Sequence, residues 1–182
     1  MARGQYLGPS RGRRAEGAVL LTLCDYAPNQ VFSEQVHEHP GFFLLVKGDH
    51  REDRRQNSVV QPEFSVIYHG TGEAHATETG PSGMRGLNIS LHSSWVDRLD
   101  LPRRPTSEAV ELVSGNRPTA LKLLAAVRGD DLSLDLVELA TELFEPFVTD
   151  LEAKPPRWLA RAKKRLEEDF ASPIGLADLA ES

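Results

Sequence analysis

A change of hydrophobic period near Leu91 restricts the fold of this chain more than any other feature. Before it, apolar segments of strand length alternate with turn-forming pairs such as Pro28-Asn29 and Pro40-Gly41. After it, apolar residues recur every three or four positions, which is the period of a helix packed on one side. The sequence therefore predicts an α+β chain, in which a sandwich or barrel of short strands over residues 18–92 is followed by an antiparallel helical region.

Individual elements can be placed within these two parts. The segments with the length and composition of strands are 19–27, 30–39, 42–48, 57–61, 64–69 and 84–91. Pro118 suits the first turn of a helix and Gly129 suits its end, so we expect a helix between them.

A second helical stripe follows, and it offers a surface for a partner. Its residues are Leu132, Leu136, Leu139, Leu143 and Phe147. Such a stripe packs on its own domain by default. Here the helical part presents more apolar surface than a small barrel easily covers, so we also expect the stripe to mediate a homodimer.

The charges are unevenly distributed along the chain. The net charge is −6, and the acidic excess lies in the middle of the sequence, whereas residues 1–17 carry four Arg and one Glu. We expect residues 1–17 to form a basic flexible arm. An acidic middle repels phosphate, so weak contact with DNA would come from the ends, including Arg157, Arg161 and Lys164.

Several histidines are candidates for a ligand or metal site. His37 and His39 are two residues apart, so on a strand they would share a face, and His75 follows a Gly-rich turn. Three neutral imidazoles that converge inside a barrel can bind a divalent metal; otherwise they line a pocket. No carboxylate evidently completes the shell, because Glu52 lies beyond Gly48 and is interpreted as a surface charge.

Other sequence signals are negative. The chain lacks the glycine patterns of a nucleophile elbow, a P-loop or a dinucleotide fold, so we do not expect an enzyme. Cys24 is the single cysteine, and no apolar run reaches the length of a membrane span. We therefore expect a cytoplasmic protein with no membrane partner.

Three segments carry a resemblance to a known family. VHEHPGFFLLVKGDHRE at Val36–Glu52 and PEFSVIYHGTGEAHA at Pro62–Ala76 resemble the cupin sensor domain of AraC/XylS transcriptional regulators. PPRWLARAKKRLEEDFASPIGLADLA at Pro155–Ala180 is similar to the opening of the DNA-binding domain of that family. The resemblance implies a cupin-like β-barrel (a jelly roll) over 18–92, a helical linker and dimerisation region over 93–153, and an incomplete helix-turn-helix domain over 154–182.

The implied function is the ligand-sensing and dimerisation part of an AraC-type regulator. The expected effector is a small molecule. The residues expected to line its pocket are His37, His39, His75, Phe43, Tyr68 and His69. Because the recognition helix is missing from this sequence, we expect only weak, non-specific DNA binding.

The metal question stays open in this interpretation. Metal-binding cupins carry a Glu soon after the paired histidines, where this chain has Gly41 and Phe42. We therefore expect no cofactor, although His37, His39 and His75 are the ligands if a metal binds. The alternatives are a free-standing, metal-dependent cupin enzyme and a short antagonist that is dominant-negative over full-length regulators.

Overall fold

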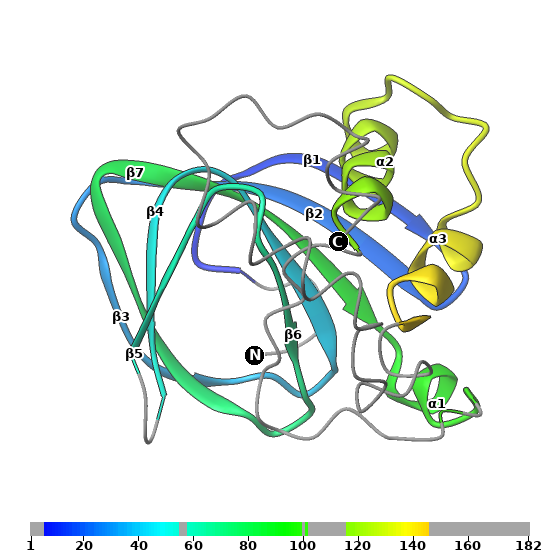
Figure 1. Cartoon of the computed structure of the whole chain (residues 1–182), viewed down its shortest axis with the longest axis horizontal. Coiled ribbons are helices and arrows are strands. Elements are labelled where there is room, and N and C mark those ends of the chain that lie inside the picture. Colours follow the sequence, from blue (N-terminus) through cyan, green and yellow to red (C-terminus); the bar gives the residue numbers. More distant parts are fainter. Residues whose placement is uncertain (1–5, 55–57, 100, 102–115, 146–182) are drawn as a thin grey trace, which may run out of the picture. The chain divides into compact units, whose positions relative to one another are not determined.

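A computed structural model describes residues 6–54, 58–99, 101 and 116–145. Within these ranges the strands are β1 (Ser10–Glu16), β2 (Val19–Tyr26), β3 (Val31–Val36), β4 (Gly41–Asp53), β5 (Ser58–Gln61), β6 (Val66–His69) and β7 (Ala74–Leu91). The helices are α1 (Ser93–Val96), α2 (Arg117–Arg128) and α3 (Leu136–Glu142). Strands precede helices, as the change of period predicts (Figure 1).

The strands form one antiparallel, jelly-roll-like sheet in the order β1-β2-β7-β4-β5. β3 pairs with β7 and β6 pairs with β4, outside this path. The sheet curls strongly (Figure 1), but among the described residues no pairing joins β5 back to β1. The expected β-barrel is therefore corrected to an open sheet, whose edges in this order are β1 and β5.

Two long strands organise this sheet. β4 and β7 pair along most of their length. The first half of β4 also pairs with β6 and its second half with β5, whereas the first half of β7 pairs with β3 and its second half with β2. The β4–β7 register shifts between Leu45 and Lys47 and again between Gly48 and His50. Gly48 has a φ of +94°, and a Cβ there would lie 2.1 Å from the carbonyl oxygen of Gly83, so this bend requires glycine.

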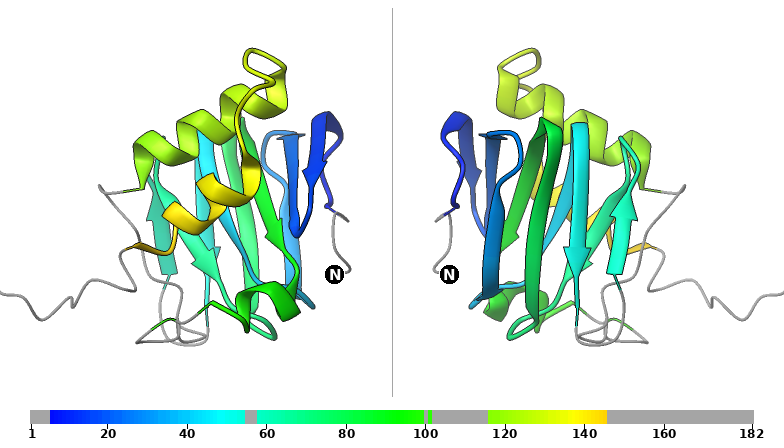
Figure 2. Two further views of the ribbon diagram at one scale, coloured as in Figure 1. Left: turned by 90° about the vertical axis from the view of Figure 1, so that its right-hand side faces the viewer. Right: turned by 90° about the vertical axis from the view of Figure 1, so that its left-hand side faces the viewer.

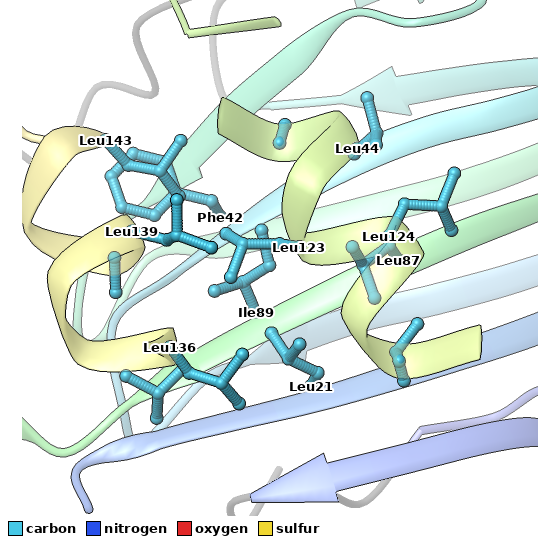
Figure 3. Packing of buried hydrophobic residues seen from close by; sticks show 14 of the residues in the cluster. Leu21, Phe42, Leu44, Leu87, Ile89, Leu123, Leu124, Leu136, Leu139 and Leu143 are labelled. Atoms are coloured by element: carbon cyan, nitrogen blue, oxygen red, sulfur yellow. The ribbon is translucent and has the colours of Figure 1, made fainter. Parts of the chain in front are cut away.

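One face of the sheet is covered by α2 and α3 (Figure 2). Figure 3 shows the core between them, in which Leu21, Ile89 and Phe42 of the strands meet Leu123 and Leu139 of the helices. The strand residues in this core alternate with residues that point to the opposite face, as the pleat of a sheet requires. Helices α2 and α3 therefore share one core with the sheet.

Helix α2 lies where its sequence signals predict. Pro118 stands in its first turn, and Gly129 ends it in the left-handed conformation at a φ of +82°. Helix α3 begins later than expected, because the Asp135 side chain accepts hydrogen bonds from the backbone N–H groups of Val137 and Glu138 and so caps the helix there.

The later start of α3 changes the expected dimerisation stripe. Leu136, Leu139 and Leu143 are buried in the core of the chain itself, whereas Leu132 precedes the helix and is 74% exposed. These three buried leucines therefore do not present a dimer surface. Phe147, the last residue of the stripe, lies outside the described residues. Homodimerisation itself stays a prediction.

The expected basic arm is partly a strand. Residues 10–16 form β1, which pairs with β2 at the edge of the sheet. Arg14 donates hydrogen bonds to the carbonyl oxygens of Asp131, Leu132 and Leu134 at 3.2, 3.2 and 2.9 Å, and Arg11 pairs with Asp25 at 2.7 Å. Arg14 thus anchors this edge strand to the segment before α3, and the prediction of a flexible arm is wrong for residues 10–16.

The chain divides by compactness into a unit of residues 1–149 and a unit of residues 150–182. The second unit lies outside the described residues, and so do the predicted phosphate contacts Arg157, Arg161 and Lys164. None of the helices in the described part of the chain is long and apolar enough to cross a membrane.

Candidate metal centre

A cluster of three imidazoles and one carboxylate lies on the face of the sheet opposite the helices. Glu52 comes from β4, His69 from the end of β6, His75 from β7, and His37 from the segment that follows β3. Strand pairing brings them together: Gln35 lies opposite His75, and Glu52 lies opposite Thr77, two residues beyond His75 on the same face.

The geometry of the cluster is that of a small ligand cage. The ligand atoms of Glu52, His69 and His75 all lie within 4.8 Å of one another. The Nε2 atom of His69 is 3.1 Å from Oε2 of Glu52, and the His69 and His75 rings stack with centroids 4.6 Å apart. The His37 ring lies 5.0 Å from that of His75 and 5.6 Å from that of His69.

The cluster is buried, and the pKa values of its residues suit the binding of a cation. Burial, followed by the neighbouring His69, lowers the pKa of His75 to about 3 and that of His37 to about 4. Burial alone would raise the pKa of Glu52, but His69, His75 and Arg54 together hold it well below its usual range. At neutral pH His37 and His75 are therefore uncharged and Glu52 is ionised, which are the forms that bind metals.

The surroundings of Glu52 hold its carboxylate in place. Arg54 donates to Oε1 of Glu52 at 2.7 Å, and the Gln61 amide lies 3.5 Å from Oε2. Arg54 also lies 3.7 Å from Oε1 of Glu73, a second buried acid whose pKa is raised by burial. Glu52 is fully buried, so these contacts compensate a charge that would otherwise be costly.

The residues fit a divalent transition metal. Two atoms bound to one ion at about 2.1 Å lie at most about 4.2 Å apart, so the observed spread needs only small side-chain rotations to close on an ion. The Nδ1 atom of His75 is buried without a hydrogen-bond partner. A buried polar atom left in this way is unusual and calls for a bound group. Two imidazoles and a carboxylate form the donor set that leaves further positions open to a ligand.

Three of the four predicted histidines meet in this cluster. His37, His69 and His75 come together, but His39 turns away: its Nδ1 lies 3.1 Å from Oγ of Ser93, and its ring lies beside that of His92. The prediction placed His37 and His39 on one strand face. β3 ends at Val36, before both residues, so the alternation of a strand does not apply to them.

The two aromatic pocket candidates lie on opposite faces. Phe43 lies on the face opposite the helices, where it borders a cavity beside the cluster. Tyr68 is buried in the helix-covered core, where its ring lies 5.1 Å from that of Phe42 and 6.0 Å from that of Phe144. Tyr68 precedes His69 on β6, so the two necessarily point in opposite directions, and Tyr68 is not a pocket residue.

Sequence reasoning missed the carboxylate. Glu52 was interpreted as a surface charge on a separate strand, but β4 continues through Gly48 to Asp53 and carries Glu52 into the cluster. The usable signal was the alternation in His50-Arg51-Glu52-Asp53, with His50 and Glu52 on one face. Gly48 conceals this signal, because a glycine between polar residues is typical of the end of a strand.

A cavity with a free volume of about 50 Å³ adjoins the cluster. It is lined by Tyr6, Leu7, Tyr26, Phe32, Gln35, His37, Phe43, His50, Glu52, His69, His75, Thr77, Met84 and Asn88. One water takes roughly 10–15 Å³ on this measure, so the cavity has room for a few waters or one small ligand.

Comparison with known proteins gives a distant likeness of structure. No protein-family model matches the chain, and no curated protein does. A cupin superfamily protein from Desulfitobacterium hafniense is similar over 46% of this chain and 76% of its own, with 18% identity and a TM-score of 0.42. A protein with a double-stranded β-helix domain from Klebsiella pneumoniae is similar over 50% of this chain and 84% of its own, with 14% identity and a TM-score of 0.41.

Enzymes also occur among the similar structures. A DMSP lyase from Ruegeria pomeroyi matches 47% of this chain and 42% of its own, with 13% identity and a TM-score of 0.40. The expectation that this chain is not an enzyme is thereby contradicted and withdrawn, since chains of similar structure include lyases. At these scores the likeness concerns strand arrangement and assigns no activity. None of the structures named here is described as an AraC/XylS regulator.

Proposed function

We propose that the chain binds a divalent transition metal through Glu52, His69 and His75 and engages a small organic molecule beside that metal. The observation that carries the proposal is the convergence of one carboxylate and two imidazoles in a buried cage. His37 stacks on both imidazoles and is available at the rim of the cage.

The cage suits chemistry on a small substrate. A metal bound there would act as a Lewis acid toward a ligand oxygen or nitrogen. Arg54 and Gln61 keep the Glu52 carboxylate oriented toward the cage, and the apolar wall formed by Phe43 and Met84 limits water in the cavity. These features support a metal-dependent activity on a compact substrate, the enzyme alternative of the sequence reading.

The test is metal content after removal and reloading. The full chain is treated with a chelator, reloaded separately with Fe²⁺, Mn²⁺, Co²⁺ and Zn²⁺, dialysed and analysed for metal per chain. We expect one ion per chain for at least one of these metals. His75→Ala should weaken binding at least ~100-fold, because loss of an outer-shell partner alone costs 10–100-fold.

His39→Ala is the matched control. It removes an imidazole close in sequence to His37, but His39 bonds to Ser93 and lies outside the cage. Its metal content should equal that of the wild-type chain. Equal metal loss in both variants, or less than a tenth of an ion per chain in the wild type, would refute the proposed centre.

Ligand-responsive transcription control is a second candidate, favoured by the likeness of Pro155–Ala180 to a DNA-binding domain. In that case a small effector in the same cavity would bias a homodimer, and the cationic residues Arg157, Arg161 and Lys164 would contact phosphate. The test is fluorescence anisotropy of the full chain with a labelled duplex. Binding that falls steeply with salt supports this candidate, and absence of binding at low salt removes it.

A further inference from the structure

The cavity contains a second polar position, away from the proposed metal ligands. His50 lines it, is only 3% exposed, and its Nδ1 atom has no hydrogen-bond partner. Across the β4–β5 pairing, His50 lies opposite Gln61, whose Oε1 atom is also buried without a partner. Gln61 is not among the residues that line the cavity, and its side chain interacts with His50. Buried polar atoms are nearly always hydrogen-bonded, so the unpartnered Nδ1 atom of His50 indicates a place where a bound group completes the bonding.

The position of His50 relative to the cage limits the size of such a group. His50 and Glu52 are two residues apart on β4 and share a face, so their backbone positions are about 7 Å apart. The Phe43 ring lies 5.0 Å from that of His50 and forms an apolar wall beside it. With about 50 Å³ of free volume, the cavity fits a molecule of roughly four or five non-hydrogen atoms.

The lining also limits the charge of the ligand. No Lys or Arg is present among the described residues that line the cavity, and Glu52 adds a negative charge. A carboxylate at the His50 end would therefore lack a cation. A hydroxyl both donates and accepts hydrogen bonds, so it satisfies Nδ1 of His50 in either tautomer.

We propose that His50 recognises a hydroxyl group of the ligand. The ligand is then a short molecule with an uncharged hydroxyl at one end, which contacts His50, and a metal-binding group at the other end. This inference rests on the proposed metal centre and names the class of molecule that it takes. His50 then determines specificity, while Glu52, His69 and His75 hold the ion.

Isosteric thiol probes test this inference on the Co²⁺-loaded full chain. A thiolate bound to Co²⁺ produces a charge-transfer absorption band, which reports occupancy. 2-Mercaptoethanol and propane-1-thiol have the same number of non-hydrogen atoms and differ in a terminal hydroxyl or methyl, and mercaptoacetate carries a carboxylate. We expect 2-mercaptoethanol to bind about 3- to 10-fold more tightly than propane-1-thiol, the range for one neutral hydrogen bond, and mercaptoacetate to bind more weakly than 2-mercaptoethanol.

Variants assign the preference to His50. His50→Leu should bind Co²⁺ but lose the preference for 2-mercaptoethanol, His50→Gln should keep part of it, and His39→Leu should keep all of it. Equal affinities of the two isosteres in the wild-type chain, or a preference that survives His50→Leu, would overturn the inference while leaving the metal centre intact. Failure to bind Co²⁺ at all would overturn both.

Discussion

The two faces of the curled sheet come from the same strands but carry different kinds of side chain. The face under α2 and α3 presents Phe42, Leu44 and Ile89 to a continuous apolar core. The opposite face has a small apolar cluster around Phe43 and Met84 and otherwise carries buried polar groups. This chain therefore places the packing that stabilises the fold on one face and the groups available for chemistry on the other.

The largest expected effect comes from neighbouring phenylalanines on the two faces. Phe42→Ala should lower the free energy of unfolding by about 3–5 kcal/mol, because it empties a site between the rings of Tyr68 and Phe144. Phe43→Ala should cost at least about 1 kcal/mol less, because Phe43 already borders a cavity. Urea unfolding of both variants measures the difference in the free energy of unfolding. Equal losses in the two variants would contradict the assignment of stabilising packing to one face.

Acidification should act on the cavity face of the metal-free chain. Unfolded imidazoles take up protons below about pH 6.5, whereas His37 and His75 in the fold do so only near their lowered pKa values of about 4 and about 3. The unfolded state therefore binds more protons in this window, and stability is lost as the pH falls through it. From pH 7 to pH 6 we expect a loss of about 1.4 kcal/mol for the two residues.

Unfolding titrations at both pH values check this loss in the wild type and in His75→Leu. The variant should show about half of the wild-type change, because only His37 remains. A pH dependence unaffected by His75→Leu would show that neither the burial nor the pKa assignment of this face is right.

A helix cap tests the stabilising face alone. Asp135→Ala should cost about 1 kcal/mol of stability, because the N–H groups of Val137 and Glu138 lose their acceptor. Metal content after reloading should not change. Asp131→Ala, which alters a turn outside α3, is the comparison variant. A loss of metal in Asp135→Ala would show that the two faces are coupled.

The smallest expected effect has the opposite sign. In the metal-free chain, His75→Leu at pH 7 should raise stability by about 0.5–1 kcal/mol, because it replaces a buried nitrogen that lacks a partner with an apolar group. Calorimetric melting of chelator-treated samples measures this. A destabilisation of more than about 1 kcal/mol would mean that His75 serves packing instead of ligand binding.

The difference between the faces also explains what the sequence could predict. Period and turn residues placed β2, β6 and α2 closely, because burial on one side of a regular element leaves a periodic pattern. The start of α3 was predicted less well. The apolar spacing begins at Leu132, but Asp135 caps the helix three residues later. The strand at residues 10–16 could not be predicted from its composition, because Arg14 binds carbonyl groups that are distant in sequence.

The site was only partly predictable, because β4 contains register shifts that change which of its residues face the cavity. Phe43 and Leu45 face the cavity side before the register shifts, and His50 and Glu52 face it afterwards, so the inward positions change from odd to even numbers. A bulge produces such a change and leaves no periodic signal. His37, His69 and His75 could be named from residue type, but the carboxylate that completes the cage depended on this bulge.

X-ray absorption spectroscopy of the metal-loaded chain tests the central claim most directly. With Zn²⁺ or Mn²⁺ bound, we expect two imidazole nitrogens and a carboxylate oxygen among the atoms that coordinate the metal. One imidazole should be lost in His75→Ala but not in His39→Ala. A shell of oxygen atoms without imidazole, or a spectrum that His75→Ala leaves unchanged, would contradict a metal centre at Glu52, His69 and His75.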